Sequence, residues 1–294
     1  MKAEIEVLQP GLFTSVQDFG RFGFRKFGVP GSGAMDSYAS KTANLILKNS
    51  VNAAVLEITQ MGPKLRFSGA TLIALSGADL SPRINGEIVE NNEVLEIQPG
   101  DELSFGRRKV GCRTFMAISG GILSEEIMKS RSWYEGVTEN FRLENGMRLP
   151  YEASEAEVSQ TYSSLRVDDH YLQTPEIDVF AGPEFHLLDE EQQVHLMDSS
   201  FSVDKNNNRM AIQLQEKVEN QLEPIITGPV VPGSVQLTPS GNLIVLMRDC
   251  QTTGGYPRVL QLSENGINSL AQKVIGDEVE FRKVREEGFE EGIQ

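Results

Sequence analysis

The chain has 294 residues, 39% hydrophobic and 23% charged, so it is long enough for two domains and can fill a hydrophobic core. Its net charge of -15 argues against nucleic acid and anionic membrane surfaces as partners. Two cysteines, Cys112 and Cys250, are no disulfide framework, and no window reads as a signal peptide or membrane span, so we expect a cytoplasmic protein.

Short apolar runs with β-branched residues recur between Gly, Pro, Asn and Ser, which predicts many short strands and a mostly-β fold with a few short helices. Helical spacing with a capping residue marks two of the three expected helices. In chain order we expect a helix capped by Asp36 and running to about Lys48, strands at 72–75, 94–97, 114–118 and 177–180, a helix over 184–196, a strand at 243–246, and a helix capped by Ser263 and stopped by Gly276.

An internal similarity suggests that the chain has two related halves. Residues 65–75 resemble residues 237–246, and each copy is followed by a Gly-Asp-Glu turn into a strand, at 100–105 and at 276–281. Chance is the alternative, because strands flanked by turns reuse few residue types. The duplication predicts domains at 1–164 and 165–294, with the boundary in the polar segment near 154–164.

Several common catalytic signatures are absent from the sequence. The three histidines, His170, His186 and His195, lack the spacing of a metal triad or of a catalytic base, so no metal site is expected. There is no GxxxxGK[ST] phosphate loop and no GxSxG nucleophile elbow. Standard hydrolase, kinase and zinc-enzyme interpretations therefore have no motif to support them.

The first polar, glycine-bearing stretch is 10–23, which sets Gln17, Asp18 and Arg21 among glycines and aromatics. An arginine offers a donor fork for a carboxylate or phosphate, and the adjacent Asp18 would orient it. A structural Asp-Arg pair in a tight loop is the equal alternative. Residues 29–33 then lead into the first helix, where backbone N–H groups either cradle an anion or simply make the turn.

The densest polar stretch is 248–257, which follows a buried-looking strand. Gln251, Thr252, Thr253 and Tyr256 offer neutral, directional hydrogen bonds of the kind that read an amide, ureido or lactam group. Asp249 is the nearest proton acceptor. A hairpin whose polar groups only satisfy each other is the alternative.

Further candidates lie in other loops. A ligand can approach the backbone closely at Ser119 and Gly120. Arg131 and Ser132 lie in a basic loop, for which plain exposure to solvent is the alternative interpretation. Gln236, just before the repeated Ser-Gly, would reach the same place as the 248–257 stretch.

Taken together and in order, these stretches resemble the allophanate hydrolase subunit 2 family, also called the biotin-dependent carboxyltransferase family. The resemblance runs from about Leu8 to Phe281 and rests on six motifs. They are Val16 to Arg21, Val29 to Asp36, Ser76 to Asp79, Ser119 to Gly121, Ser130 to Ser132 and Gln251 to Pro257.

The resemblance implies two cyclophilin-like β-barrel domains and a partner, the B subunit, which is itself cyclophilin-like and KipI-like. Members include the C subunit of 5-oxoprolinase, which with the A and B subunits opens the 5-oxoproline lactam to glutamate at the expense of ATP. A biotin carrier has a Met-Lys-Met hairpin, and this chain lacks one. The stretch Met128-Lys129-Ser130 has serine where the second methionine would stand. We therefore expect an oxoprolinase-type subunit, inactive alone, with ATP in the complex and no bound biotin on this chain.

The resemblance also carries site residues, position by position, while their individual roles are our hypotheses. Asp18 and Asp249 would handle protons, Arg21 and Arg131 would hold a carboxylate or phosphate, and Gln251 to Thr253 would hydrogen-bond the lactam. Trp133 departs from the smaller residue expected after Arg131-Ser132 and affects only the shape of that loop. The remaining candidates for substrate binding are Gln17, Asp79, Ser119, Gly120, Ser132, Gln236 and Tyr256.

Three other functions remain open at this point. A KipA-type binding protein would sequester a homologue of the B subunit that inhibits a kinase, without turnover. Carboxyl transfer from biotin to urea or a similar amide would need a separate biotin carboxylase and carrier. Prolyl isomerisation is suggested only by the barrel shape, and a fold does not carry a function.

Overall fold

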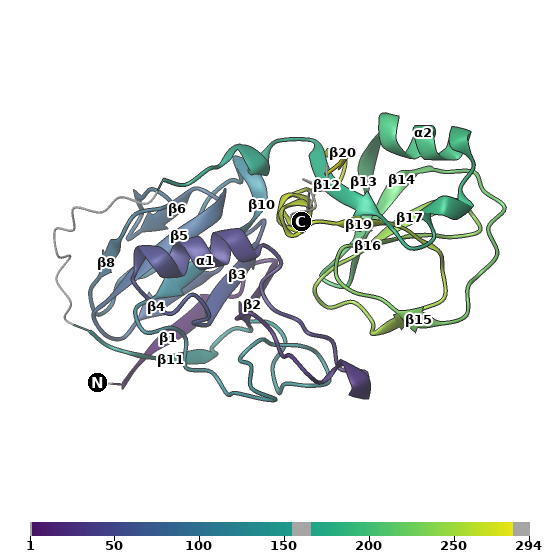
Figure 1. Cartoon of the computed structure of the whole chain (residues 1–294). Helices are drawn as coiled ribbons and strands as arrows, with labels where there is room; N and C mark the ends of the chain where they lie inside the picture. The colour runs from purple at the N-terminus through teal and green to yellow at the C-terminus, as the bar shows by residue number, and fades with distance from the viewer. Residues whose placement is uncertain (1, 155–165, 285–294) are drawn as a thin grey trace, which may run out of the picture.

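The computed structural model describes residues 2–154 and 166–284. We call these the first and the second unit, and Figure 1 shows them side by side. The predicted domain boundary, near 154–164, falls almost wholly outside the described residues, so the division at 164 stays a prediction.

The first unit contains two sheets that share one hydrophobic core. In β1 every second residue is buried, including Ala3, Ile5 and Val7, which is the pattern of a sheet with one covered face. Side chains from both sheets meet in the core, for example Phe67 from one and Ile58 and Met116 from the other. In spatial order one sheet is β11 (Arg148–Glu152), β1 (Lys2–Gln9), β4 (Lys64–Phe67), β9 (Glu102–Phe105), β6 (Pro82–Ile84) and β7 (Glu87–Ile88); the other is β2 (Phe13–Gln17), β3 (Val55–Thr59), β10 (Val110–Ile118), β5 (Thr71–Asp79) and β8 (Leu95–Ile97).

The second unit is a closed barrel of seven strands, so the mostly-β fold class with a β-barrel is confirmed. Closure removes the exposed strand edges that an open sheet would leave, and the interior is filled by aliphatic and aromatic side chains. Around the barrel the strands are β12 (Glu176–Ala181), β19 (Arg258–Leu262), β16 (Ser234–Leu237), β17 (Asn242–Leu246), β14 (Ala211–Lys217), β13 (Ser200–Asn207) and β20 (Glu278–Lys283); a separate ribbon pairs β15 (Gly228–Pro229) with β18 (Thr253–Gly254).

The helices begin where capping residues predict. Asp36 accepts the backbone N–H of Ala39 at 3.0 Å and opens α1 (Ser37–Ile46), while Ser263 accepts that of Gly266 at 3.0 Å and opens α3 (Glu264–Ala271). The helix expected over 184–196 is wrong at its start: a short 3-10 turn, η3 (Phe185–Leu187), is followed by an extended residue, and α2 (Glu190–Asp198) begins only after a capping box of Asp189 and Gln192. Two further 3-10 turns are η1 (Arg25–Phe27) and η2 (His170–Leu172).

The two copies of the sequence similarity differ in strand pairing. In the second copy β16 and β17 pair with each other, with Val235 opposite Val245, whereas in the first copy β4 and β5 belong to different sheets. What both copies share is turn chemistry, because Gly100 and Gly276 each take a positive φ, 94° and 84°, before the following strand. The two segments therefore differ in strand pairing, and their origin by duplication stays a prediction.

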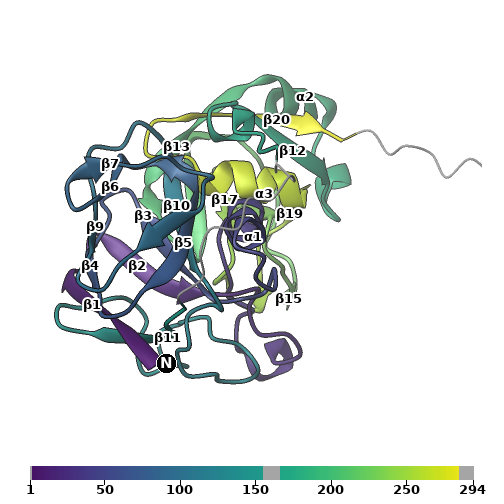
Figure 2. The same cartoon turned by 90° about the vertical axis from the view of Figure 1, so that its left-hand side faces the viewer.

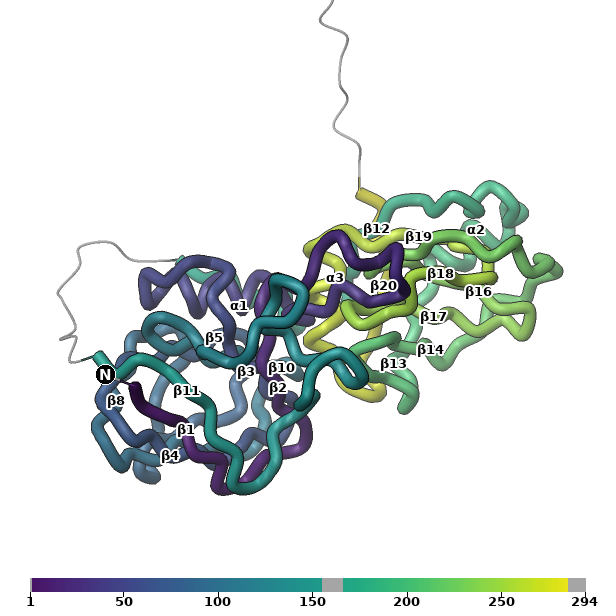
Figure 3. Tube along the Cα trace, turned by 90° about the horizontal axis from the view of Figure 1, so that it is seen from below, coloured from purple at the N-terminus to yellow at the C-terminus, as the bar shows by residue number. Residues whose placement is uncertain are grey.

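Polar and apolar contacts join the two units. Helices α1 and α3 lie side by side, as Figure 2 shows, and the Ser37 backbone N–H donates to Asn268 Oδ1 at 2.9 Å. Met35, from the first unit, is fully buried within the core of the barrel. Figure 3 shows the segment around residues 20–33 passing to the second unit, where Arg25 donates to the Val230 carbonyl and the Ser32 N–H donates to the Arg248 carbonyl.

Both cysteines are free and buried. Over the described ranges, no helix has the length and apolar character needed to cross a membrane.

Candidate functional site

A pocket of about 470 Å³ lies where the two units meet. The first unit supplies aromatic walls, including Tyr134 and Phe141, and the second unit supplies Met210. Charged side chains at its base, Arg113, Arg209 and Asp249, are only 4 to 8% exposed. A pocket with apolar walls and a few converging polar groups at a domain interface is the usual form of a small-molecule site.

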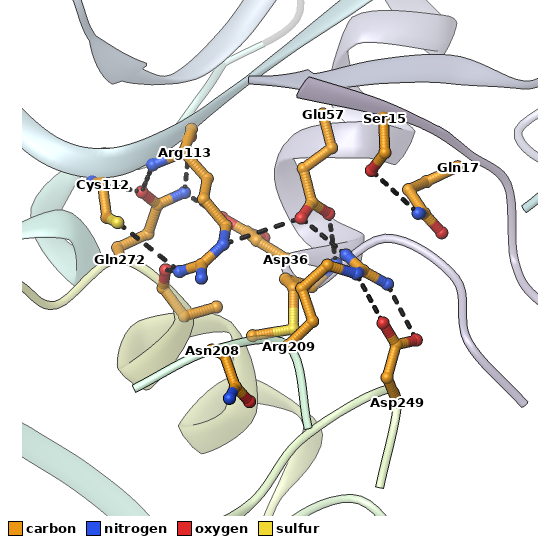
Figure 4. Close-up of polar contacts among 12 residues, drawn as sticks. Ser15, Gln17, Asp36, Glu57, Cys112, Arg113, Asn208, Arg209, Asp249 and Gln272 are labelled. Atoms are coloured by element: carbon orange, nitrogen blue, oxygen red, sulfur yellow. Dashed lines mark hydrogen bonds and ion pairs between the residues drawn. The ribbon is translucent and has the colours of Figure 1, made fainter. Parts of the chain in front are cut away.

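The base of this pocket is a network of buried ion pairs, drawn in Figure 4. Arg209 Nε and Nη2 donate to the two oxygens of Asp249 at 2.8 and 3.2 Å, and Nη1 donates to Glu57 Oε1 at 2.6 Å. Burial alone would lower the pKa of Arg209, but Asp249 and Glu57 outweigh it and the pKa is raised. Arg209, from the turn between β13 and β14, thus connects a carboxylate on β3 to one in its own unit.

Arg113 is held less completely than Arg209. Its Nη1 donates to the Ala271 carbonyl and to Cys112 Sγ, and its Nε lies 3.6 Å from Glu57 Oε1, beyond hydrogen-bond distance. This Nε is buried and lacks a hydrogen-bond partner. Arg113 therefore brings a positive charge to the lining of the pocket, while its Nε is buried on the side of the Glu57 carboxylate.

Gln272, at the end of α3, fixes the backbone that carries Arg113. Its Oε1 accepts the N–H groups of Cys112 and Arg113 at 2.9 Å, and its Nε2 donates to the Arg113 carbonyl at 2.9 Å and to Asp36 Oδ2 at 2.7 Å (Figure 4). Burial raises the pKa of Asp36, although the hydrogen bonds from Gln272, Ala39 and Tyr171 act in the other direction. The arrangement sets β10 against the second unit and thereby orients Arg113.

Asp18 is 6% exposed, and its carboxylate accepts hydrogen bonds from a loop of its own unit. Its Oδ1 accepts the hydroxyls of Ser130 and Ser132, each at 2.6 Å, and its Oδ2 accepts the Arg131 N–H at 2.7 Å. The motif residues Asp18 and Ser132, far apart in sequence, are thus brought together. The carboxylate of Asp18 holds this loop, and a proton-handling role for it stays a prediction.

Gln17 and Arg21 are fully buried beside the same loop. Gln17 donates to the Trp133 carbonyl at 3.2 Å and Arg21 donates to the Ser132 carbonyl. Arg131 is partly exposed, and its guanidinium donates to the Ser124 carbonyl. None of these three lines the interdomain pocket, although Trp133 and Tyr134, which follow the loop, do.

The stretch from Gln251 to Tyr256 begins directly after Cys250 and lies at the surface of the second unit. Gln251 and Thr253 are exposed and Tyr256 is 40% exposed, while Thr252 is half-buried and accepts the Val230 N–H with its carbonyl at 3.2 Å. Gln236 is buried, with its amide 3.4 Å from the Tyr256 carbonyl. The stretch therefore follows the pocket residue Asp249 closely in sequence, but Gln251, Thr253 and Tyr256 are exposed and do not line the pocket.

Three predicted residues lie elsewhere. Asp79 pairs with Lys109 at 2.9 Å and accepts the Ser81 N–H at 2.7 Å, and none of these residues lines the pocket. Ser119 and Gly120 follow the end of β10, where the Gly120 N–H donates to Asn49 Oδ1 at 2.9 Å. The binding roles expected for these three residues stay predictions.

Sequence reasoning missed Glu57, Arg113 and Arg209. Glu57 stands in Val-Leu-Glu-Ile-Thr and Arg113 in Cys-Arg-Thr-Phe-Met, so each is a lone charge inside an otherwise buried strand. Because an unpaired charge is costly to bury, such a residue signals a partner or a ligand. Within the described ranges, no group of three or more His, Cys, Asp or Glu side chains could hold a metal ion.

Comparison with known proteins places this arrangement in a family. The family model described as "Carboxyltransferase domain, subdomain A and B" matches residues 27–283, a range that contains Glu57, Arg113, Arg209 and Asp249. The chain belongs to this carboxyltransferase family. It is 32% identical over 283 residues to the C subunit of 5-oxoprolinase from Escherichia coli (strain K12), covering 94% of this chain and 90% of that protein.

Other relatives carry the carboxyltransferase domain within longer chains. Urea amidolyase of Lachancea kluyveri is 42% identical over 130 residues, which are 44% of this chain and 7% of that one. The crystal structure of TTHA0988 superposes with a TM-score of 0.84 at 25% identity, covering 95% of this chain and 55% of that one. The crystal structure of the K. lactis urea amidolyase superposes with a TM-score of 0.82 at 30% identity, covering 96% of this chain and 19% of that one. This chain thus spans about half of TTHA0988.

Proposed function

We propose that this chain is one component of a multi-subunit, ATP-dependent 5-oxoprolinase, which opens the 5-oxoproline lactam to glutamate together with the A and B subunits. The support is the interdomain pocket with its incompletely bonded Arg113, in a chain that shares 32% identity with the C subunit of a 5-oxoprolinase. 5-Oxoproline is a small lactam with one carboxylate, so it matches a pocket that has apolar walls and the cationic side chain of Arg113 in its lining.

Each part of the substrate has a counterpart in the pocket. The guanidinium of Arg113 would bind the carboxylate, a role that our sequence hypothesis gave to Arg21 and Arg131. Asp249 lines the pocket and would handle protons. Asn207, Asn208 and Gln60, which also line it, carry amides suited to the lactam N–H and carbonyl.

ATP belongs to the complex in this proposal, because the sequence contains no phosphate loop that would assign nucleotide binding to this chain. Contact with the B subunit would use the face that carries η1 and the β15–β18 ribbon. Large apolar side chains are exposed there: Phe22 at 78%, Phe27 at 69% and Ile226 at 95%. Exposed apolar side chains gathered on one face are typical of a protein interface.

Two other functions have some support. Carboxyl transfer to urea or a similar amide is favoured by the 42% identity with urea amidolyase over 130 residues. A KipA-type role, in which the chain captures a homologue of the B subunit without turnover, is favoured by the same exposed apolar face. Both predict the same pairing and differ in the chemistry that follows.

The experiment is reconstitution of the purified chain with the homologues of the A and B subunits from its own genome. We expect glutamate to form from 5-oxoproline when ATP is added, and only when all three proteins are present. Glutamate formation no faster than in the mixture without this chain would contradict the proposal. Capture of the B subunit without turnover would favour the binding role, and urea-dependent consumption of carboxybiotin would favour carboxyl transfer.

A further inference from the structure

A second pocket, of about 410 Å³, lies beside helix α3, and we call it the α3 pocket. Helix α1 contributes Tyr38 to its lining, the segment that leads into the barrel contributes Asp168 and Tyr171, and α3 contributes Asn268 and Ser269. Figure 2 shows α1 and α3 side by side. None of the described residues that line the α3 pocket lines the interdomain pocket, so the two pockets are separate.

Asn268 and Ser269 bring polar groups to the α3 pocket that the protein itself does not use. The two residues are only 4% and 6% exposed. Asn268 Oδ1 accepts the backbone N–H of Ser37 at 2.9 Å, which fixes the orientation of the amide and leaves Nδ2 without a partner among the described residues. The Ser269 hydroxyl is also unbonded within the described part of the chain. Because buried polar groups are nearly always hydrogen-bonded, these two groups indicate a partner inside the pocket.

The lining of the α3 pocket carries more negative than positive charge. It contains three carboxylates, Asp168, Glu176 and Asp178, whereas Arg282 is the only lysine or arginine among its described residues. Arg282 Nε donates to Asp178 Oδ1 at 2.7 Å and the same guanidinium pairs with Glu176, so one cation is shared by two carboxylates. Asp168 forms no ion pair within the described residues. Burial and the neighbouring charge of Asp168 raise the pKa of Asp169, as expected where negative charge is in excess.

Two tyrosine rings form the aromatic wall of the α3 pocket. Tyr38 and Tyr171 pack edge to face, with ring centroids 5.4 Å apart and an interplanar angle of 86°. Tyr38 Oη accepts the Asp168 N–H at 3.1 Å, and Tyr171 Oη donates to Asp36 Oδ2 at 2.7 Å, so both rings are held in place. Aromatic rings attract organic cations through their negative faces, and a nearby carboxylate adds to this attraction.

We propose that the α3 pocket binds a small organic ammonium ion that carries an oxygen acceptor on a neighbouring carbon, with ethanolamine as the simplest example. The ammonium group lies beside Asp168 and the tyrosine rings, and the oxygen accepts from Asn268 Nδ2. The Ser269 hydroxyl can donate or accept, so it bonds to either group of the ligand. A bare metal ion does not fit, because Asn268 Nδ2 can only donate. The volume of the pocket leaves room for larger members of this class.

This binding is independent of the function proposed for the complex. None of the residues in the α3 pocket is assigned to 5-oxoproline, and the test uses the isolated full chain without the A and B subunits. Opening of 5-oxoproline can fail while ammonium binding stands, and the reverse holds as well.

The test is an NMR titration of the ¹⁵N-labelled full chain with ethanolamine, ethylammonium or ethylene glycol at neutral pH and equal ionic strength. Ethanolamine should shift the side-chain amide signal of Asn268 saturably; Asn268→Asp, which lacks that amide, assigns the signal. Ethylammonium lacks the oxygen and should bind about 2- to 12-fold more weakly, as for the loss of one neutral hydrogen bond. Ethylene glycol lacks the charge and should give no saturable shift.

Variants separate binding in the α3 pocket from a general attraction of an acidic protein for cations. Asp168→Asn keeps an oxygen for the His170 N–H but removes the charge, so it should weaken ethanolamine binding by about 3-fold or more. Ser269→Ala should weaken it by about 2- to 12-fold. Glu87→Gln, at an exposed residue of β7, removes the same charge elsewhere and should leave the affinity unchanged.

Three results would overturn the proposal. They are no saturable shift of the Asn268 signal, an ethylene glycol affinity equal to that of ethanolamine, or equal weakening by Asp168→Asn and Glu87→Gln. Because Asp168 is exposed, its variant should fold, so the comparison with Glu87→Gln remains available if Ser269→Ala is unstable.

Discussion

Glu57, Arg113, Arg209 and Asp249 place two positive and two negative charges at the base of the interdomain pocket. The charges balance, but the hydrogen bonds do not, because Arg209 is bonded by both carboxylates while Arg113 Nε has no acceptor. We therefore expect substitutions in this network to fall into two classes. Those at Arg113 should affect the ligand, and those at the carboxylates should affect folding.

Arg113→Met should lower kcat/KM for 5-oxoproline in the reconstituted complex. Loss of a charge-assisted hydrogen bond is worth about 1.5–3 kcal/mol, which corresponds to a roughly 10- to 150-fold decrease. Steady-state kinetics measure this, and Arg148→Met, at an exposed ion pair on the outer sheet, is the matched control. An unchanged kcat/KM with a folded variant would exclude Arg113 from substrate binding.

Glu57→Gln should destabilise the protein strongly. The Glu57 side chain is fully buried and faces Arg209 at 2.6 Å, so the substitution leaves a buried cation short of a partner, at a cost of about 3–5 kcal/mol. Urea denaturation measures the loss of unfolding free energy. Glu4→Gln, which breaks an exposed pair with Arg148, is the control and should leave the urea midpoint nearly unchanged. Equal effects of the two changes would show that the network contributes little.

At the scale of elements, the starts of helices α1 and α3 could be predicted because an N-cap is a signal between residues close in sequence. Asp36 and Ser263 could be recognised because a cap needs only the side chain and the N–H three residues later. Helix α2 begins six residues later than expected, at Glu190, because Leu188 is extended and Asp189 is the N-cap. The capping box at Asp189 and Gln192 was the stronger signal.

The candidate site was predicted less completely than the fold. Asp249 was identified because it borders a glycine-bearing polar stretch, but Glu57 and Arg113 lie in strands that share no motif with it. Their relation depends on the pairing of β3 with β10 and on the approach of the second unit, at Arg113 and Ala271, for example. Contacts of such sequence separation leave no local pattern from which to infer them.

The N-cap of α1 gives a prediction about pH. Because burial raises the pKa of Asp36 above its ordinary value of 3.8, the folded protein retains this proton after the unfolded chain has lost it. This group therefore favours folding most below pH 3.8, and its contribution falls as the pH rises toward the folded-state pKa.

Asp36→Asn removes that dependence. The variant should be less stable than the wild type at low pH, because an amide has a single oxygen with which to accept from Ala39, Gln272 and Tyr171, and this deficit should shrink as the pH rises. Urea unfolding of both proteins from about pH 4 to pH 7 measures the difference. A deficit that grows with pH would contradict the assignment.

At the scale of the whole molecule, the pocket exists only because the two units are held together. The first unit supplies Arg113 and the aromatic walls, and the second supplies Arg209 and Asp249. The arrangement of the units is therefore part of the site. It is secured by Gln272, by the ion pairs of Arg209 and by the insertion of Met35 into the barrel core.

Met35→Ala should destabilise the second unit, although the residue belongs to the first. Removing a fully buried Met side chain from a packed core costs about 2–5 kcal/mol. Hydrogen exchange of barrel amides, such as those of β16 and β17, locates the loss. Met61→Ala, at a residue that is 61% exposed, serves as the control. Protection lost only in the first unit would contradict the packing described for Met35.

Phe22→Ser combined with Phe27→Ser should weaken capture of the B subunit by at least about 10-fold, since buried aromatic anchors at interfaces are often worth about 2 kcal/mol or more. Folding should be unaffected, because both rings are largely exposed in the isolated chain. Surface plasmon resonance measures the affinity, and Val194→Ser on α2 is the matched control. Unchanged affinity in the double variant would move the interface to another face.

The position of Met35 also bears on how the chain is made. A ribosome releases residue 35 long before residue 281, in the last strand of the barrel, has been synthesised. Domains generally fold in the order of their synthesis, so the first unit can fold with Met35 in position before the barrel core that surrounds it has formed. The barrel then closes around a side chain that is already in place. A gene fragment that encodes the second unit alone would give a barrel whose core lacks the Met35 side chain. Such a product should aggregate unless the first unit is supplied as a separate chain.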